Sequence, residues 1–361
     1  MHRIEPRPEV LAAPAAHHGA LDYGELERLR IDPDAVLDFS VNSNPFGPSP
    51  KVWEALRAMP LDRYPDREAL ALRRALAARL DVEIQQIVMG NGVAEALWLV
   101  ALAFVRPGDD VLVINPTFDE YARAAVLMGA HVETWAASAE TQFAIAPEAI
   151  HERLAALKPR LAFCCNPNNP TGAMVSRAAL EAWATDHPET LFVIDEAYVN
   201  FALSAASVIG VGVPNLLALR SMTKDYALAG LRLGYAVGPA HVISALARVR
   251  PPWSVNALAQ AAGLAALADD AHLQRTLVQL QAEKSKLVAG LSALGLAPVP
   301  SATHYFLVEV GDAAAFRSAL LQHGVMVRDC TSFGLPQYVR IATRRPAENA
   351  RLLEAIREVR A

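Results

Sequence analysis

An apolar run leads into a lysine at Leu216-Leu217-Ala218-Leu219-Arg220-Ser221-Met222-Thr223-Lys224. Its first four residues predict a short buried strand, and a second apolar run ending at Gly238 follows the segment 230–235. A lysine amine held in a dry pocket near other cations loses its proton readily and can attack a carbonyl to form a Schiff base. Because Ser-x-Thr-Lys also occurs in many exposed turns, this stretch needs support from the rest of the chain.

The composition predicts a large buried core and argues against several functional classes. Hydrophobic residues make up 53% of the 361 residues, which suits a large domain with a smaller one. The net charge of −5 gives no basic surface for nucleic acid. The longest apolar run, 97–105, is too short to cross a bilayer, and the N-terminus shows no signal-peptide pattern. Three cysteines do not make a disulfide framework. We therefore expect a soluble, cytoplasmic protein without membrane or nucleic-acid partners and without a metal site.

Between residues 87 and 238, apolar runs alternate with helical patterns, which predicts a mostly parallel sheet covered by helices. In open sheets of this kind, ligands bind at the carboxyl ends of the strands. Five positions follow such runs: Gly92, Phe118, Asn169, Asp195 and Lys224. The turn 90–92 also precedes a helix, so its free N–H groups can bind phosphate, although a plain strand-to-helix turn remains the alternative.

The pattern changes after Asn256. One long helical region, about 257–294, precedes short strands near 305–310, 325–328 and 338–342, which predicts a smaller α+β domain. We therefore divide the chain into an N-terminal arm that contributes to the small domain (1–45), a large domain (46–254) and the small domain (255–361). Arg328 and Arg340 lie on the small domain's strands, where an arginine fork suits a carboxylate or phosphate and a structural ion pair is the alternative.

One cofactor chemistry accounts for the residues at the strand ends. A cofactor phosphate would lie on the helix start at Gly92 and on Ser221, while a flat ring would stack on Phe118. Asp195 would pair with a ring nitrogen, and Lys224 would hold the cofactor aldehyde. This combination predicts pyridoxal phosphate.

The chain resembles class I and II aminotransferases of the aspartate-aminotransferase fold over nearly its full length. Four blocks carry the resemblance in the family's order: Asn-Pro-Asn-Asn-Pro-Thr-Gly at 166–172, Asp-Glu-Ala-Tyr at 195–198, Ser-Met-Thr-Lys at 221–224 and Gly-Leu-Arg-Leu-Gly-Tyr at 230–235. The resemblance implies an aspartate-aminotransferase-like large domain with a smaller α+β domain. It also implies a homodimer with shared active sites, in which Tyr64 reaches the cofactor phosphate bound by the neighbouring subunit.

The resemblance implies a role for each matching residue. Lys224 would form the Schiff base and carry the proton, Asp195 would bind the ring nitrogen, and Arg340 would hold the substrate α-carboxylate. Tyr198 and Asn169 would bind the ring hydroxyl oxygen. The cofactor phosphate would be surrounded by Gly92, Val93, Ala94, Ser221, Thr223 and Arg232. Relatives often carry a hydroxyl or acidic side chain where this chain has Val93 and Ala94, so we expect weaker cofactor retention.

Within the family, the chain looks like the branch of histidinol-phosphate aminotransferases and L-threonine-O-3-phosphate decarboxylases. The segments 38–45, 253–258 and 327–330 look closer to the decarboxylases. By this resemblance His18 and Arg328 would grip a substrate phosphate, and Asn44 would join the substrate-binding set. We therefore expect decarboxylation of L-threonine O-3-phosphate, used in cobalamin side-chain synthesis.

Two alternatives to decarboxylation stay open. The first is transamination between a small phosphorylated amino compound, such as histidinol phosphate, and 2-oxoglutarate. The second is a cofactor-binding regulator without catalysis, which would need a fused DNA-binding domain; we expect the short N-terminal arm to leave no room for one.

Overall fold

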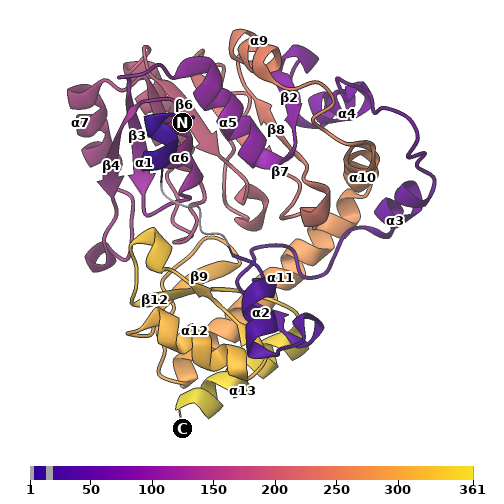
Figure 1. Cartoon of the computed structure of the whole chain (residues 1–361), viewed down its shortest axis with the longest axis vertical. Coiled ribbons are helices and arrows are strands. Elements are labelled where there is room, and N and C mark those ends of the chain that lie inside the picture. The colour runs from indigo at the N-terminus through magenta and orange to yellow at the C-terminus, as the bar shows by residue number, and fades with distance from the viewer. Residues whose placement is uncertain (1–3, 14–18, 361) are drawn as a thin grey trace.

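The computed structural model describes residues 4–13 and 19–360, which form two units joined along one side (Figure 1). The larger unit is built on a seven-stranded sheet in the order β2-β8-β7-β6-β5-β3-β4. Only β8 runs antiparallel to its neighbours, so the sheet is mostly parallel, as predicted. The strands are β2 (Ile87–Gly90), β3 (Asp110–Asn115), β4 (His131–Ala136), β5 (Leu161–Cys165), β6 (Leu191–Asp195), β7 (Leu216–Ser221) and β8 (Gly234–Val237).

Helices cover both faces of this sheet because successive side chains of each buried strand point to opposite faces. In β3, Val111 and Val113 belong to the apolar cluster that includes side chains of α5, α6 and α9, whereas Leu112 and Ile114 belong to the cluster that includes side chains of α7 and α8. Both faces of the sheet are therefore shielded from solvent. The bounds of these helices are α5 (Gly92–Phe104), α6 (Glu120–Leu127), α7 (Pro147–Leu157), α8 (Arg177–Asp186) and α9 (Ala240–Val249).

A third apolar cluster lies at the β2–β8 edge, where α4 (Leu70–Leu80) and α10 (Ala257–Leu267) pack near α3 (Pro50–Arg57). The long helical region predicted near 257–294 is present as two helices, because α10 ends at Leu267 and α11 spans Asp270–Ala293. The Asp269 side chain begins the new helix by accepting a hydrogen bond from the His272 N–H, 3.3 Å away. The chain changes direction at this point, which lets α11 run from one unit into the other (Figure 1).

The smaller unit holds an antiparallel sheet, β11-β12-β9, and a two-stranded parallel sheet, β1-β10. Helices α12 and α13 and the second half of α11 cover the three-stranded sheet. The unit is therefore α+β, as predicted. Its strands and helices are β1 (Leu37–Asp38), β9 (Tyr305–Glu309), β10 (Val325–Met326), β11 (Arg328–Asp329), β12 (Tyr338–Ala342), α2 (Tyr23–Leu29), α12 (Ala313–Gln322) and α13 (Pro346–Arg360).

The residues before the larger unit contact both units. Strand β1 pairs with β10, and Arg317 of α12 forms an ion pair with Glu25 of α2, so this part joins the smaller unit. Helix α1 (Pro8–Ala12) instead lies near α6, and the Arg7 guanidinium donates to the Leu127 carbonyl over 3.2 Å. The domain boundaries stay a prediction. In the described part of the chain, no helix combines the length and apolar character needed to cross a bilayer.

Short 3-10 helices connect the main elements, and they span Pro33–Ala35, Ile84–Gln86, Ala139–Thr141, Val199–Phe201, Ala229–Leu231 and Thr331–Phe333.

Candidate active site

The carboxyl ends of β5, β6 and β7 open onto a cavity of about 130 Å³. Cys165, Asp195 and Ser221 end these strands and line the cavity. Apart from Gly92 and Tyr64, every residue predicted to bind the cofactor lines it as well. Neighbouring parallel strands bring their carboxyl ends to one edge, which is why separate sequence signals meet here.

Lys224 follows β7 in a turn and faces this cavity. Burial lowers the pKa of Lys224 to about 8, and the positive charges of Arg340 and Arg232 act in the same direction, while Asp195 opposes them. A larger share of its amine is therefore neutral near neutral pH than for an exposed lysine. A neutral amine is the form that attacks a carbonyl.

Asp195 is held by two hydrogen bonds at the end of β6. Its Oδ2 accepts from the Tyr121 hydroxyl over 2.6 Å, and its Oδ1 accepts from the Ala197 N–H over 2.9 Å. Burial raises the pKa of Asp195 to about 6, and the Tyr121 hydrogen bond opposes this rise. Asp195 therefore has a fixed orientation and gains from a cationic partner, such as a protonated ring nitrogen.

The opposite end of the cavity is suited to an anion. Helix α5 begins at Gly92, whose φ of +80° favours glycine, and a Cβ there would lie 2.9 Å from Arg232 Nη2. The first N–H groups of a helix have no partner within it. The hydroxyls of Ser221 and Thr223 lie 2.6 Å apart and line the same cavity. Helix start, hydroxyls and guanidinium together fit a phosphate group.

A second cavity, of about 400 Å³, shares six residues with the first, among them Lys224, Phe118, Asn169 and Tyr198. Arg328 and Arg340 of the smaller unit also line it. These four shared residues thus lie between the anion site of the larger unit and the arginines of the smaller one.

The two arginines are directly paired across the antiparallel strands β11 and β12. Arg328 Nη2 donates to the Ser332 hydroxyl over 2.7 Å, while Arg340 donates to the Asn169 side chain and to the Ser40 carbonyl. Like charges at directly opposite positions destabilise a sheet. An anion that binds both guanidinium groups relieves this repulsion.

Among the described residues, three predicted ones line neither cavity: Gly92, Asn44 and Tyr64. Asn44 is buried, but its side chain bonds the Asp225 carbonyl and the Thr276 hydroxyl instead of facing the arginines. Tyr64 is 81% exposed, and its ring lies 4.8 Å from that of Trp253. His18 lies outside the described residues. The substrate role of Asn44 and the cofactor role of Tyr64 stay predictions.

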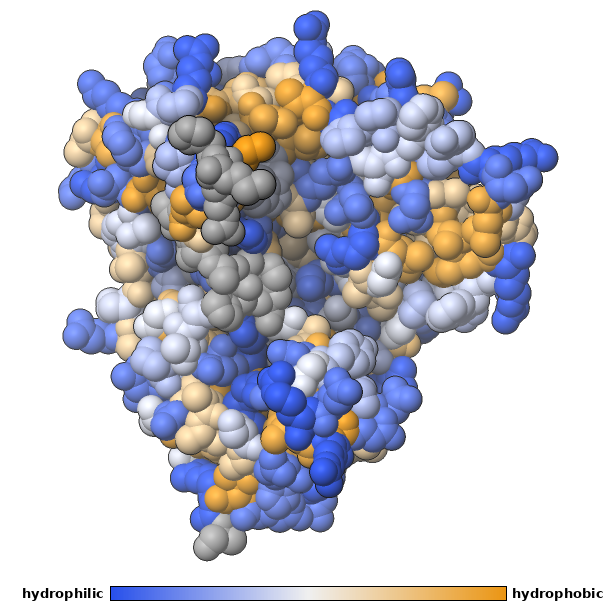
Figure 2. Space-filling model, viewed as in Figure 1, coloured by the Kyte–Doolittle hydropathy of each residue, from blue (hydrophilic) through white to orange (hydrophobic). Residues whose placement is uncertain are grey.

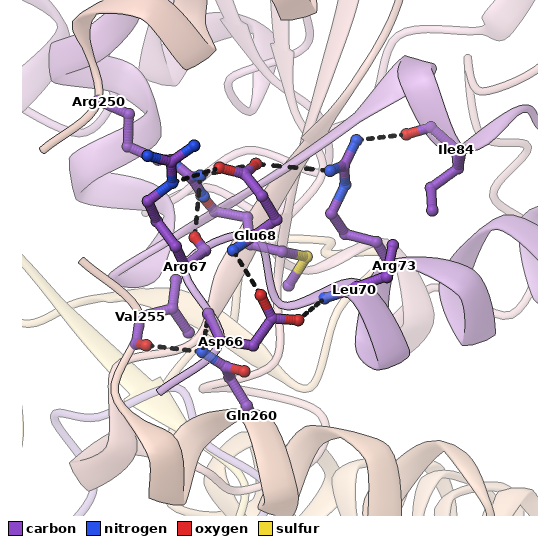
Figure 3. A network of polar contacts seen from close by, with 10 residues as sticks. Asp66, Arg67, Glu68, Leu70, Arg73, Ile84, Arg250, Val255 and Gln260 are labelled. Carbon is purple, nitrogen blue, oxygen red and sulfur yellow. Dashed lines mark hydrogen bonds and ion pairs between the residues drawn. The ribbon is translucent and has the colours of Figure 1, made fainter. Parts of the chain in front are cut away.

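The segment that follows Tyr64 is held by a polar network (Figure 3). The Arg250 guanidinium donates to the Met89 carbonyl over 3.1 Å and to the Arg67 carbonyl over 3.2 Å, and it pairs with Glu68. Met89 belongs to the strand that leads to Gly92. Arg250 therefore joins the Tyr64 segment to the anion end of the cavity.

Sequence reasoning missed three residues of the cavity walls. Tyr121 lies on α6, three residues after Phe118, and its hydroxyl donates to Asp195. Buried Asn42 lines the larger cavity, and so does Glu120, whose carboxylate accepts from the Trp98 indole over 3.0 Å. No separate motif marks these residues. In the described residues, His, Cys, Asp and Glu side chains form no group of three suited to a metal.

Comparisons with known proteins agree with this geometry. The profile of the family described as aminotransferase class I and II matches residues 34–356. Histidinol-phosphate aminotransferase 2 of Pseudomonas fluorescens is 38% identical over 93% of this chain and 92% of its own length.

Solved structures give the same picture. Histidinol-phosphate aminotransferase of Sinorhizobium meliloti, solved with pyridoxal-5'-phosphate, matches with a TM-score of 0.87 and 26% identity over 98% of this chain and 96% of its own. L-threonine-O-3-phosphate decarboxylase of Porphyromonas gingivalis matches with a TM-score of 0.80 and 30% identity over 89% and 98%. The chain therefore belongs to the pyridoxal-phosphate-dependent class I and II aminotransferase family, as its four motifs predict.

Proposed function

We propose that this enzyme transfers an amino group between histidinol phosphate and 2-oxoglutarate. The observation that carries the proposal is the cross-strand pair Arg328 and Arg340, which lines one cavity with Lys224. Two paired guanidinium groups suit a phosphate ester. A lysine of lowered pKa suits a Schiff base with the cofactor aldehyde, from which a substrate amine can displace it. The names of the aminotransferase relatives support transamination better than the decarboxylation that we expected from sequence segments.

Different residues of the cavity bind the cofactor ring, bind its phosphate and tune its charge. When bound, pyridoxal phosphate withdraws electrons from the amine-bearing carbon of the substrate. Asp195 favours this by holding a positive ring nitrogen, and Phe118 supplies an apolar face for the ring. The start of α5, with Ser221 and Arg232, holds the cofactor phosphate.

Lys224 moves the proton that distinguishes transamination from decarboxylation. Its pKa of about 8 makes the neutral amine more abundant near neutral pH than in an exposed lysine, so Lys224 can accept a proton from the amine-bearing carbon of the substrate and return it to the aldehyde carbon of the cofactor. Tyr198 and Asn169 line both cavities and hold the edge of the ring beside this lysine. Arg328 and Arg340 would fix the substrate phosphate and thereby set which bond at that carbon stands perpendicular to the ring plane, which is the orientation from which a bond breaks.

Decarboxylation of L-threonine O-3-phosphate is the second candidate. It is supported by the structural match to the Porphyromonas decarboxylase, at 30% identity. Both substrates carry a phosphate ester one carbon away from the amine-bearing carbon, so the same arginines suit both.

We also propose a homodimer in which Tyr64 serves the neighbouring active site. Large apolar side chains are exposed around it, including Trp53 of α3, Leu61 and Leu264 of α10. Figure 2 shows an apolar area on the side where Figure 1 places α3 and α10. An exposed area of this kind is typical of a protein–protein interface.

The three buried free cysteines fit a reducing compartment, and we propose a cytoplasmic location.

The test compares two products from one preparation. With histidinol phosphate and 2-oxoglutarate we expect glutamate, and with L-threonine O-3-phosphate we expect no release of carbon dioxide. Lys224→Ala should abolish glutamate formation, which shows that the product comes from this site. Arg328→Met should raise KM for histidinol phosphate far more than it lowers kcat. Carbon dioxide release without glutamate formation would replace the proposal with the second candidate.

A further inference from the structure

Asn44 lies in the connection that leaves the smaller unit after β1 and enters the larger one. It is only 4% exposed. Its main-chain N–H donates to the Lys224 carbonyl over 2.8 Å, and its side-chain amide donates to the next carbonyl, that of Asp225, over 3.0 Å. One residue thus holds two consecutive carbonyls at the proposed reactive lysine.

The same amide also contacts the helix that joins the two units. Asn44 Nδ2 donates to Thr276 Oγ1 over 2.8 Å, and the Thr276 hydroxyl donates in turn to the Leu273 carbonyl over 2.9 Å. The amide oxygen accepts from the Phe46 N–H over 3.1 Å. These partners fix the orientation of the amide, because the Thr276 hydroxyl proton is already used and only a donor can face its oxygen.

Thr276 belongs to α11, which contributes to both cores. Leu273, Leu277 and Leu280 pack in the core of the larger unit, whereas Leu287 and Leu291 pack in the core of the smaller one. Two segments connect the units: the one that contains Asn44, and α11. Asn44 therefore links both of them to the turn that carries Lys224.

We propose that Asn44 is a positioning residue that holds the Lys224 turn in register with the smaller unit and its arginines. This rests on the proposed function, because it takes Lys224 as the reacting lysine. Arg328 and Arg340 belong to the smaller unit and Lys224 to the larger. A substrate held by its phosphate reaches the lysine amine only when the two units keep a fixed separation. The contacts of Asn44 set that separation at the lysine itself.

Two variants remove the side-chain contacts while the main-chain bond to Lys224 stays. Asn44→Ala deletes the amide, and Thr276→Val deletes its partner on α11. Asn215→Ala is the matched control: Asn215 is also buried, at 8% exposure, and its amide donates to three main-chain carbonyls. Asn215 precedes β7 at the end opposite Lys224. Its loss lowers stability in a similar way without touching the lysine turn.

The measurement is the rate at which cofactor-free protein reacts with added pyridoxal phosphate, followed by absorbance and located by borohydride trapping and mass spectrometry. We expect Asn44→Ala to slow modification of Lys224 by roughly tenfold or more, because small misplacements of a reacting group have effects of this size. Thr276→Val should show a smaller loss in the same direction, and Asn215→Ala should react at the wild-type rate.

The outcomes separate this inference from the proposed function. Wild-type protein that is trapped at another residue, or not trapped, contradicts the proposed function. Trapping at Lys224 with equal rates in Asn44→Ala and Asn215→Ala overturns the positioning role. If Asn44→Ala does not fold, Thr276→Val decides alone, and a wild-type rate in that variant overturns the inference. With histidinol phosphate as substrate, Asn44→Ala should lower kcat more than it raises KM, because the arginines remain intact.

Discussion

The substitution Lys224→Met should stabilise the cofactor-free protein. Burial lowers the pKa of Lys224 from 10.5 to about 8. Between these values the unfolded chain binds a proton that the folded chain has released, so stability rises with pH through this window. Below pH 8 the buried ammonium lowers the free energy of unfolding by its full amount, which is about 3 kcal/mol for such a shift. Methionine fills a similar volume without the charge.

Urea unfolding of cofactor-free wild type and Lys224→Met checks this value. Near pH 7 we expect the variant to be more stable by up to about 3 kcal/mol, and we expect the difference to shrink as the pH approaches 10.5. Lys51→Met is the control, because Lys51 is exposed and its loss should change stability by no more than about 0.5 kcal/mol. A variant no more stable than wild type near neutral pH, or a gap that stays constant as the pH rises, would refute the reasoning.

Four further results are expected. Asp195→Asn should keep Lys224 reactive toward the cofactor but lower kcat roughly 10²-fold or more, since the charge that holds the ring nitrogen is lost; stopped-flow spectra check both. Arg250→Met should lower the free energy of unfolding by about 2 kcal/mol, because two carbonyls and Glu68 lose a partner, whereas Arg67→Met, at a side chain 64% exposed, should change it little. Ala94→Ser should tighten cofactor retention, and unchanged affinity in equilibrium dialysis contradicts that. Phosphoethanolamine should inhibit at least as strongly as L-serine O-phosphate, because a carboxylate finds no arginine once both hold phosphate.

The sequence predicted the sheet and one edge of the site because both depend on local pattern. Continuous apolar runs such as 161–165 and 191–194 become strands buried on both faces. Their carboxyl ends must meet in a parallel sheet, so Asp195 and Lys224 could be placed together without any knowledge of distances. Arg328 and Arg340 of the smaller unit line one cavity with Lys224, a placement that the family resemblance implied and that local pattern alone did not.

The contacts that the sequence did not reveal are long-range and made by side chains with several possible partners. Asn44 was grouped with substrate-binding residues, yet its amide meets Thr276, which is 232 residues away in the chain. Tyr121 is fully buried and stacks on Phe163 with 5.0 Å between the ring centroids, but its hydroxyl donates to Asp195. Periodicity reports which face a residue takes, whereas the partner of its polar atom depends on how remote segments pack.

The choice between the two candidate reactions comes down to what the second arginine binds. Histidinol phosphate and L-threonine O-3-phosphate share the amine, the phosphate ester and the spacing between them, so neither Lys224 nor the anion pair alone discriminates. On the amine-bearing carbon they differ in the remaining substituent, which is an imidazolylmethyl group in the first and a carboxylate in the second; the second also carries a methyl group on the phosphate-bearing carbon. Arg328 and Arg340 are directly opposite each other. A phosphate that engages both leaves a carboxylate without a cationic partner in a partly desolvated cavity, which is costly. A carboxylate bound by Arg340 alone is instead held apart from a phosphate bound by Arg328. The substrate is then rotated about the bond between its amine nitrogen and the carbon that bears it. This rotation changes which bond at that carbon stands perpendicular to the plane of the cofactor ring. Because the bond in that orientation is the one that breaks, the reaction changes with it.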